Sequence, residues 1–119
     1  ENPDIVFVGE APGADEDRLG FPFVGRAGKL LDKWIEEFKI NKYNFYIMNA
    51  LKCRPPENRD PLPEEKINCR NFFTRQLEIL NPKIIQIRFI LVLRGQAGIC
   101  QISFFVVPFL QSTIFINIL

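Results

Sequence analysis

The chain has 119 residues, of which 47% are hydrophobic and 24% charged, and its formal net charge at pH 7 is +1. This composition predicts one globular domain or part of one, without the strongly basic character of many nucleic-acid-binding proteins. The sequence contains no histidine, which excludes Ser-His-Asp and Cys-His catalysis and every zinc site that needs imidazole.

Strands and helices are expected to alternate along the chain. The apolar run 4–8 ends in glycine, as a buried strand does, and apolar residues at helical spacing predict an amphipathic helix over 27–38. Further on, the pattern predicts a strand at 45–51, a proline loop at 55–63, a helix at 63–80 and an isoleucine-rich strand at 83–93. This order indicates an α/β fold with a mostly parallel central sheet, helices on its faces and ligands at the carboxyl ends of its strands.

The turn after the first strand reads GEAPG, from Gly9 to Gly13. It lacks the Gly-Lys-Ser/Thr of a phosphate loop, and a tight strand-to-helix turn that needs glycine explains it when it is considered alone. The two glycines flank the rigid Pro12, so the backbone can approach a planar ligand closely. Phe23, at a loop-to-helix junction, is either a core residue or an aromatic side chain that faces a ligand.

Asn49 lies near the end of the second expected strand, among apolar residues. A buried asparagine usually satisfies its amide by capping nearby backbone. At the carboxyl end of a strand, the amide can instead hydrogen-bond the pairing edge of a base. One fixed carboxamide matches the ring N–H and the carbonyl of uracil, and it mispairs with cytosine, whose pattern is the opposite.

The three cysteines are Cys53, Cys69 and Cys100, an odd number that fits a disulfide framework poorly. Free buried thiols are the simplest interpretation of Cys53 and Cys69, because an iron–sulfur cluster normally takes four thiolates. The chain begins ENPD, without an initiator methionine or a signal peptide, which predicts an intracellular protein and a fragment.

Residues 4–85 resemble the type 4 uracil-DNA glycosylases, the iron–sulfur branch of the uracil-DNA glycosylase superfamily. The motifs GEAPG, G-x-PFVGRAG-x-LLD, a strand ending in asparagine, KCRPP-x-NRDP and P-x-PEE…C follow one another in the family's order and at compatible spacing. The resemblance implies a three-layer α/β/α fold, incomplete in this chain. It also implies a DNA-repair hydrolase that cleaves the N-glycosidic bond of uracil in DNA and leaves an abasic site.

The same resemblance assigns roles to individual residues. Gly9, Glu10 and Ala11 are expected to line the uracil pocket, with Phe23 stacking on the flipped base and Asn49 hydrogen-bonding its pairing edge. Glu10 and Asn49 are the implied catalytic residues, Glu10 by orienting water or supporting the cationic sugar. A structural role for the Glu10 carboxylate in this turn is the alternative.

The resemblance further implies a cofactor, a partner and a location. Cys53 and Cys69 match two of the four thiolate ligands of a structural 4Fe–4S cluster. Uracil-containing DNA is the implied partner, and a cytoplasmic monomer without membrane attachment is expected.

The chain departs from this family in two ways. It lacks the family's upstream C-x-x-C pair and its downstream His-Pro-Ser block, whose histidine donates to the other uracil carbonyl. We therefore expect that the chain does not hold the cluster and excises uracil poorly or not at all. Two alternatives are a non-catalytic uracil- or DNA-binding module of the same superfamily and an α/β domain without a ligand.

The resemblance stops at about residue 87, which divides the chain into a partial domain, 1–87, and an apolar tail, 88–119. The tail has no charged residue from 95 to 119. A frame-shifted reading of the coding sequence is the leading interpretation. The alternatives are a membrane-spanning or partner-binding segment within 99–119 and a divergent strand of the core.

Overall fold

The computed structural model describes residues 2–87 and 103–106. Within these ranges, strands and helices alternate as the sequence predicts, and two short 3₁₀ turns, η1 and η2, follow α2 and β2. The elements are β1 (Ile5–Gly9), α1 (Ala14–Leu19), α2 (Arg26–Glu37), η1 (Ile40–Lys42), β2 (Phe45–Asn49), η2 (Pro56–Asn58), α3 (Pro63–Leu80), β3 (Ile84–Ile87) and β4 (Ser103–Val106).

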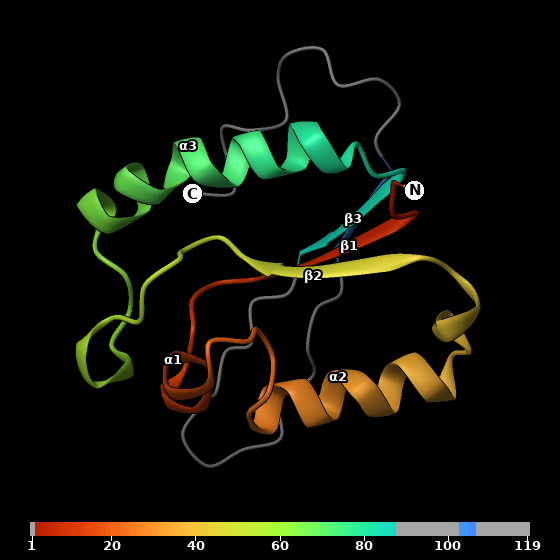
Figure 1. Cartoon of the computed structure of the whole chain (residues 1–119), viewed down its shortest axis with the longest axis horizontal. Helices are drawn as coiled ribbons and strands as arrows, with labels where there is room; N and C mark the ends of the chain where they lie inside the picture. Colours follow the sequence, from red (N-terminus) through yellow and green to blue (C-terminus); the bar gives the residue numbers. More distant parts are fainter. Residues whose placement is uncertain (1, 88–102, 107–119) are drawn as a thin grey trace.

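The sheet has the strand order β2-β1-β3-β4. β1 pairs in parallel with both β2 and β3, while β4 pairs antiparallel with β3. Helix α3 covers one face of this sheet, and α1 and α2 lie on the other (Figure 1). The prediction of an α/β fold in three layers, with a mostly parallel sheet, is confirmed.

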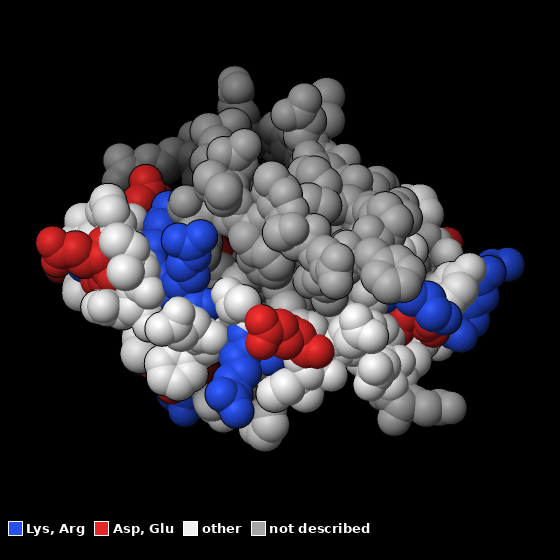
Figure 2. Space-filling model, turned by 90° about the horizontal axis from the view of Figure 1, so that it is seen from above, with Lys and Arg blue, Asp and Glu red and all other residues white. Residues whose placement is uncertain are grey.

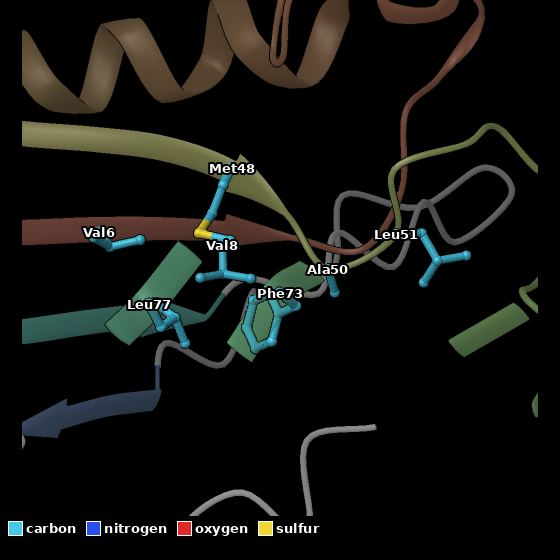
Figure 3. Close-up of a cluster of buried hydrophobic side chains, with 7 residues drawn as sticks. All are labelled: Val6, Val8, Met48, Ala50, Leu51, Phe73 and Leu77. Atoms are coloured by element: carbon cyan, nitrogen blue, oxygen red, sulfur yellow. The ribbon is translucent and has the colours of Figure 1, made fainter. Parts of the chain in front are cut away.

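Alternating residues of the strands build a separate core on each face, because successive side chains of a strand point to opposite sides. On the α3 side, seven buried side chains from β1, β2 and its continuation, and α3 pack together (Figure 3): Val6, Val8, Met48, Ala50, Leu51, Phe73 and Leu77. On the α2 side, Phe7 packs with Leu31 and Ile35. Gly9 lies two residues after Phe7 in β1, and Asn49 lies two residues after Ile47 in β2. Because alternate residues of a strand face the same side, Gly9 and Asn49 also face the α2 side of the sheet.

Helix α3 begins and ends where the sequence signals place it. Pro63 occupies its first turn, and the Glu65 carboxylate accepts the Leu62 N–H at 2.8 Å, which caps the helix start. Asn81 adopts a left-handed conformation, with φ of 40°, directly before Pro82, and its N–H donates to the Leu77 carbonyl at 2.8 Å. These local signals fix both ends of the helix.

Two elements differ from the expectation, and a third is described only in part. Residues 14–19 were not among the expected helices, but they form α1, which the Glu16 carboxylate caps at its start and Gly20 ends with φ of 76°. Strand β2 ends at Asn49 instead of residue 51, because the chain then turns toward the proline loop at 55–63. Strand β3 is described to Ile87, and the remainder of the predicted strand, 88–93, lies outside the described residues.

Most of the apolar tail also lies outside the described residues. Its described part, β4, pairs with β3 in the register Ile85↔Phe105. The frame-shift interpretation and the domain division at 87 stay predictions. Among the residues that the structure describes, no helix has the length and apolar character needed to cross a membrane.

Candidate functional site

Three of the predicted site residues meet at the carboxyl edge of the parallel strands. Gly9 and Asn49 end β1 and β2 and are direct partners in the register. A Cβ atom on Gly9 would overlap Asn49 Oδ1, and it would lie 2.6 Å and 2.8 Å from two ring carbons of Phe23. Only glycine therefore leaves room for the amide and the ring together. Asn49 is 8% exposed, so its carboxamide is presented from a mostly buried position.

The backbone of Phe23 is left-handed, with φ of 57°. A non-glycine residue in this region is strained by about 1–3 kcal/mol, and the surrounding structure must hold it there. Gly28, in the first turn of α2, supplies part of this support, since a Cβ atom on Gly28 would overlap the Phe23 carbonyl oxygen. The first turn of α2 thus packs directly on the Phe23 backbone, and the ring joins the core on the α2 side.

The predicted turn residues Glu10 and Ala11 follow Gly9 and are half-buried. The carbonyls of Gly9 and Glu10 accept the N–H groups of Ala50 and Leu51, each at 2.9 Å. The turn therefore continues alongside the chain after β2. Ala11 packs against the core on the α3 side, away from the face that carries Phe23.

A cavity of about 350 Å³ borders the end of β2. Among the described residues its lining includes Asn49, but not Gly9, Glu10, Ala11 or Phe23. The other lining residues come from the first loop, α1, β2, the chain after β2, and α3: Pro12, Glu16, Asp17, Gly20, Phe21, Pro22, Tyr46, Ile47, Met48, Leu51, Lys52 and Gln76. Of the predicted site residues, only Asn49 lines the cavity. We therefore define the candidate site by the contact between Asn49, Phe23 and Gly9, and not by the cavity.

Two charged residues that the sequence analysis did not single out hold the site in place. The Glu16 carboxylate accepts the N–H of Gly13 at 3.1 Å and that of Gly25 at 2.8 Å. The Lys52 ammonium donates to the Asn49 carbonyl at 2.6 Å, and burial lowers the pKa of this lysine, although the nearby Cys69 opposes the shift. The G-x-x-E pattern at Gly13 signals a capping glutamate, but no local pattern signals the Gly25 or Asn49 contacts.

Of the two predicted thiols, Cys69 is placed on the α3 side of the sheet. Cys69, on α3, is half-buried against the core on that side, and its Sγ accepts the Lys52 N–H at 3.4 Å. Cys53 follows Lys52 in the chain and is exposed, and both thiols are free. The Phe23 ring and the Cys69 thiol therefore lie on opposite faces of the sheet.

These two thiols fit only half of an iron–sulfur ligand set. A 4Fe–4S cluster normally takes four thiolates. The described part of the chain brings together no group of three or more residues that could hold a metal ion. An N–H donor to the Cys69 sulfur is the kind of contact that tunes cluster thiolates, but these residues do not complete a cluster site.

The proline loop at 55–63 and the residues beside it are held by an ion pair and by hydrogen bonds. Arg59 binds Glu65 through two contacts of 2.7 and 2.9 Å, and Arg54 donates to Asn58 Oδ1 at 2.8 Å. The bonds from Arg59 and from the Leu62 N–H lower the pKa of Glu65 to about 2. On the face seen from the α3 side, basic and acidic side chains of the described residues are intermixed (Figure 2).

Comparisons with known proteins point to one family. Residues 1–95 match the family model described as the uracil DNA glycosylase superfamily. The type-4 uracil-DNA glycosylase of Archaeoglobus fulgidus is 54% identical over 85 residues, which cover 71% of this chain and 43% of that protein. The type-4 enzyme of Thermotoga maritima is 54% identical over 81 residues, covering 68% of this chain and 42% of that protein. The chain thus spans less than half the length of these relatives, and the resemblance read from its motifs is confirmed.

Proposed function

Because this chain belongs to the uracil DNA glycosylase superfamily, we propose that it carries the base-recognition part of a DNA-repair hydrolase that removes uracil from DNA. The observation that carries this proposal is the convergence of the Asn49 amide, the Phe23 ring and the Gly9 backbone at one edge of the sheet. An amide, a flat apolar ring and a backbone without a side chain together suit a planar base with polar edges.

Asn49 selects the base in this proposal. Its carboxamide oxygen accepts the ring N–H of uracil, and its amide nitrogen donates to the neighbouring carbonyl. Cytosine presents an acceptor and a donor in the reverse order, which leaves polar groups without partners. Burial of Asn49 supports this role, because an unsatisfied buried polar group disfavours the wrong base by about 1–3 kcal/mol.

Phe23 receives the flipped base by stacking. Extruding a base from duplex DNA costs a few kcal/mol, and this cost is lowest for a mispaired or unpaired base. Stacking on an aromatic side chain stabilises the bound base by about 1–3 kcal/mol and so offsets part of this cost. The half-buried ring of Phe23 beside Gly9 supports such a platform.

The reaction is hydrolysis of the bond between C1′ of the sugar and N1 of uracil. The electron pair leaves with uracil, the oxygen of water bonds to C1′, and a proton of that water ends on the uracil product. Donors to the uracil carbonyls lower the barrier by stabilising the departing anion, which is the catalytic role of Asn49. Glu10, in the turn after β1, is proposed to orient the water or to support the cationic sugar.

This chain is expected to bind uracil better than it cleaves. It contains no histidine, and the family resemblance implies a histidine that donates to the second uracil carbonyl. Removing one such donor lowers the rate by about 10²–10³-fold in comparable anion-stabilising sites. A non-catalytic uracil- or DNA-binding module is therefore the second candidate. We expect the protein to act on DNA inside the cell as a monomer.

Uracil binding by the 119-residue chain tests the proposal, measured by isothermal titration or by shifts in its nuclear magnetic resonance (NMR) spectrum. We expect uracil to bind in preference to cytosine, and Asn49→Ala to weaken uracil binding about tenfold or more. Asn71→Ala, an exposed asparagine on α3, is the matched control and leaves binding unchanged. Equal uracil binding by Asn49→Ala and the unaltered chain contradicts the assignment.

An excision assay on a uracil-containing oligonucleotide then separates the two candidates. Slow formation of abasic sites that depends on Asn49 favours an impaired glycosylase. Uracil binding without abasic-site formation favours the binding module. Excision at the rate of a complete family member contradicts the expected impairment.

A further inference from the structure

Glu16 contacts both ends of the loop that carries Phe23. This loop runs from Gly20, which ends α1, to Gly25, which precedes α2. The Gly20 N–H donates to the Glu16 backbone carbonyl at 2.8 Å, and the Gly25 N–H donates to the Glu16 carboxylate, also at 2.8 Å. The Glu16 side chain therefore binds the Gly25 end of the loop, while its backbone carbonyl, which any residue would supply, binds the Gly20 end.

The second carboxylate oxygen of Glu16 is engaged as well. It accepts the Gly13 N–H at 3.1 Å, which ties the loop to the turn after β1. A Cβ atom on Gly13 would lie 2.7 Å from this oxygen, and one on Gly25 would lie 3.1 Å from the other. The carboxylate passes closely between two glycine backbones, so both of its oxygens are used and its position is tightly defined.

The loop needs such a clamp, because Phe23 holds a left-handed backbone with φ of 57°. Without restraint, a phenylalanine at this position relaxes to negative φ, and its ring then swings away from Gly9 and Asn49. Gly28 supports the Phe23 backbone from the α2 side. The Glu16 carboxylate supports the Gly25 end of the loop, two residues after Phe23.

We propose that Glu16 is a positioning residue that sets the Phe23 ring beside the Asn49 amide, and so determines the affinity of the site for a planar base. This inference rests on the proposed function for its ligand, but its structural part does not need one. Glu16 touches no base in this role and acts only through the loop.

The first arm of the test is free of ligand. Nuclear Overhauser contacts between the Phe23 ring and the Gly9 α-protons, and hydrogen exchange of the Gly13 and Gly25 amides, are measured by NMR. In Glu16→Ala we expect the ring contacts to disappear and both amides to exchange about tenfold faster. Glu16→Gln offers one acceptor oxygen in place of two, so it gives intermediate values. Glu37→Ala, an exposed glutamate on α2, is the matched control.

The second arm is a double-mutant cycle on uracil affinity. If Glu16 acts through the ring, Glu16→Ala combined with Phe23→Ala weakens binding no more than Phe23→Ala alone. Additive losses overturn the proposal and assign Glu16 an independent contact or a general structural role. Retained contacts between Val6 and Leu77, both fully buried, verify that each variant is folded. If Glu16→Ala does not fold, Glu16→Gln carries both arms.

The two arms separate this proposal from the proposed function. Unchanged Phe23 contacts in a folded Glu16→Ala variant overturn the positioning role, whatever the protein binds. Lost Phe23 contacts in a protein that never binds uracil support the positioning role and contradict the proposed ligand.

Discussion

At the scale of single residues, the candidate site depends on two glycines, Gly9 and Gly28, each of which leaves space for a different neighbouring group. Gly9 leaves space for the Phe23 ring and the Asn49 oxygen, and Gly28 leaves space for the Phe23 carbonyl. Gly28 lies within α2, where glycine is normally unfavourable compared with alanine by about 1 kcal/mol. Its presence there follows from the close approach of the Phe23 backbone.

Gly28→Ala should therefore destabilise the protein, although the same change in an ordinary helix stabilises it. The added Cβ overlaps the Phe23 carbonyl oxygen, and overpacking of this kind costs about 1–3 kcal/mol. Urea unfolding measures the change in the free energy of unfolding. Gly20→Ala is the comparison, since no atom lies within 4 Å of its added Cβ and only the positive φ of 76° opposes it, at about 1 kcal/mol. A stability gain in Gly28→Ala contradicts the packing described above.

At the scale of elements, the proline loop and the start of α3 form one braced unit. Arg59 in the loop binds the Glu65 carboxylate, which also caps the helix by accepting the Leu62 N–H. One carboxylate thus joins the loop after Cys53 to the helix that carries Cys69. The brace fixes the path of the chain between the two thiols.

The pKa of Glu65 gives this brace a defined pH dependence. Its carboxyl has a pKa of about 2 in the folded protein, against an ordinary value of about 4.5. A lowered carboxyl pKa stabilises the folded state above the unfolded value, and this contribution is lost as the pH falls from about 4.5 to about 2. We expect the stability difference between the unaltered protein and Glu65→Gln to shrink over that window.

Urea midpoints at several pH values, with NMR titration of the Glu65 side chain, make this measurement. Glu64→Gln changes the neighbouring exposed carboxylate, which takes no part in the bonds to Arg59 and Leu62, and serves as the control. A Glu65 carboxyl that titrates near its ordinary value shows that the brace does not form in solution.

At the scale of the whole molecule, the sheet separates two chemistries. The Phe23 ring and the Asn49 amide belong to the α2 side, and Cys69 belongs to the α3 side. Lys52 connects them, because its ammonium holds the Asn49 carbonyl and its N–H holds the Cys69 sulfur. The Cys69 thiol therefore lies against the turn after β2, on the opposite face of the sheet from the Phe23 ring.

Reconstitution with iron and sulfide tests the thiol site at this scale. The 119-residue chain brings two thiols to this turn, and a 4Fe–4S cluster normally takes four. We expect iron analysis to find far less than one cluster per chain, and the double variant Cys53→Ser, Cys69→Ser to retain similar iron. One stable cluster per chain, lost in the double variant, contradicts this expectation.

The sequence by itself determined the elements and the types of residue in the site. Apolar periodicity located β1, β2 and α2, and Pro63 and Pro82 located the two ends of α3, because these signals act between neighbours in the chain. The motif order identified the family and named Gly9, Phe23 and Asn49 before any contact between them was known.

Only the tertiary structure decided how these residues meet. The left-handed Phe23 backbone, the space that Gly9 and Gly28 leave, and the bond from Gly25 to Glu16, nine positions apart, depend on packing between α1, α2 and the strand ends. The folding of the acidic segment 14–19 into α1 was missed for a related reason, since Gly20 and the Glu16 contacts define a helix too short for a clear apolar period. Local patterns report which groups a chain carries, whereas contacts between distant groups require that the elements already be packed together.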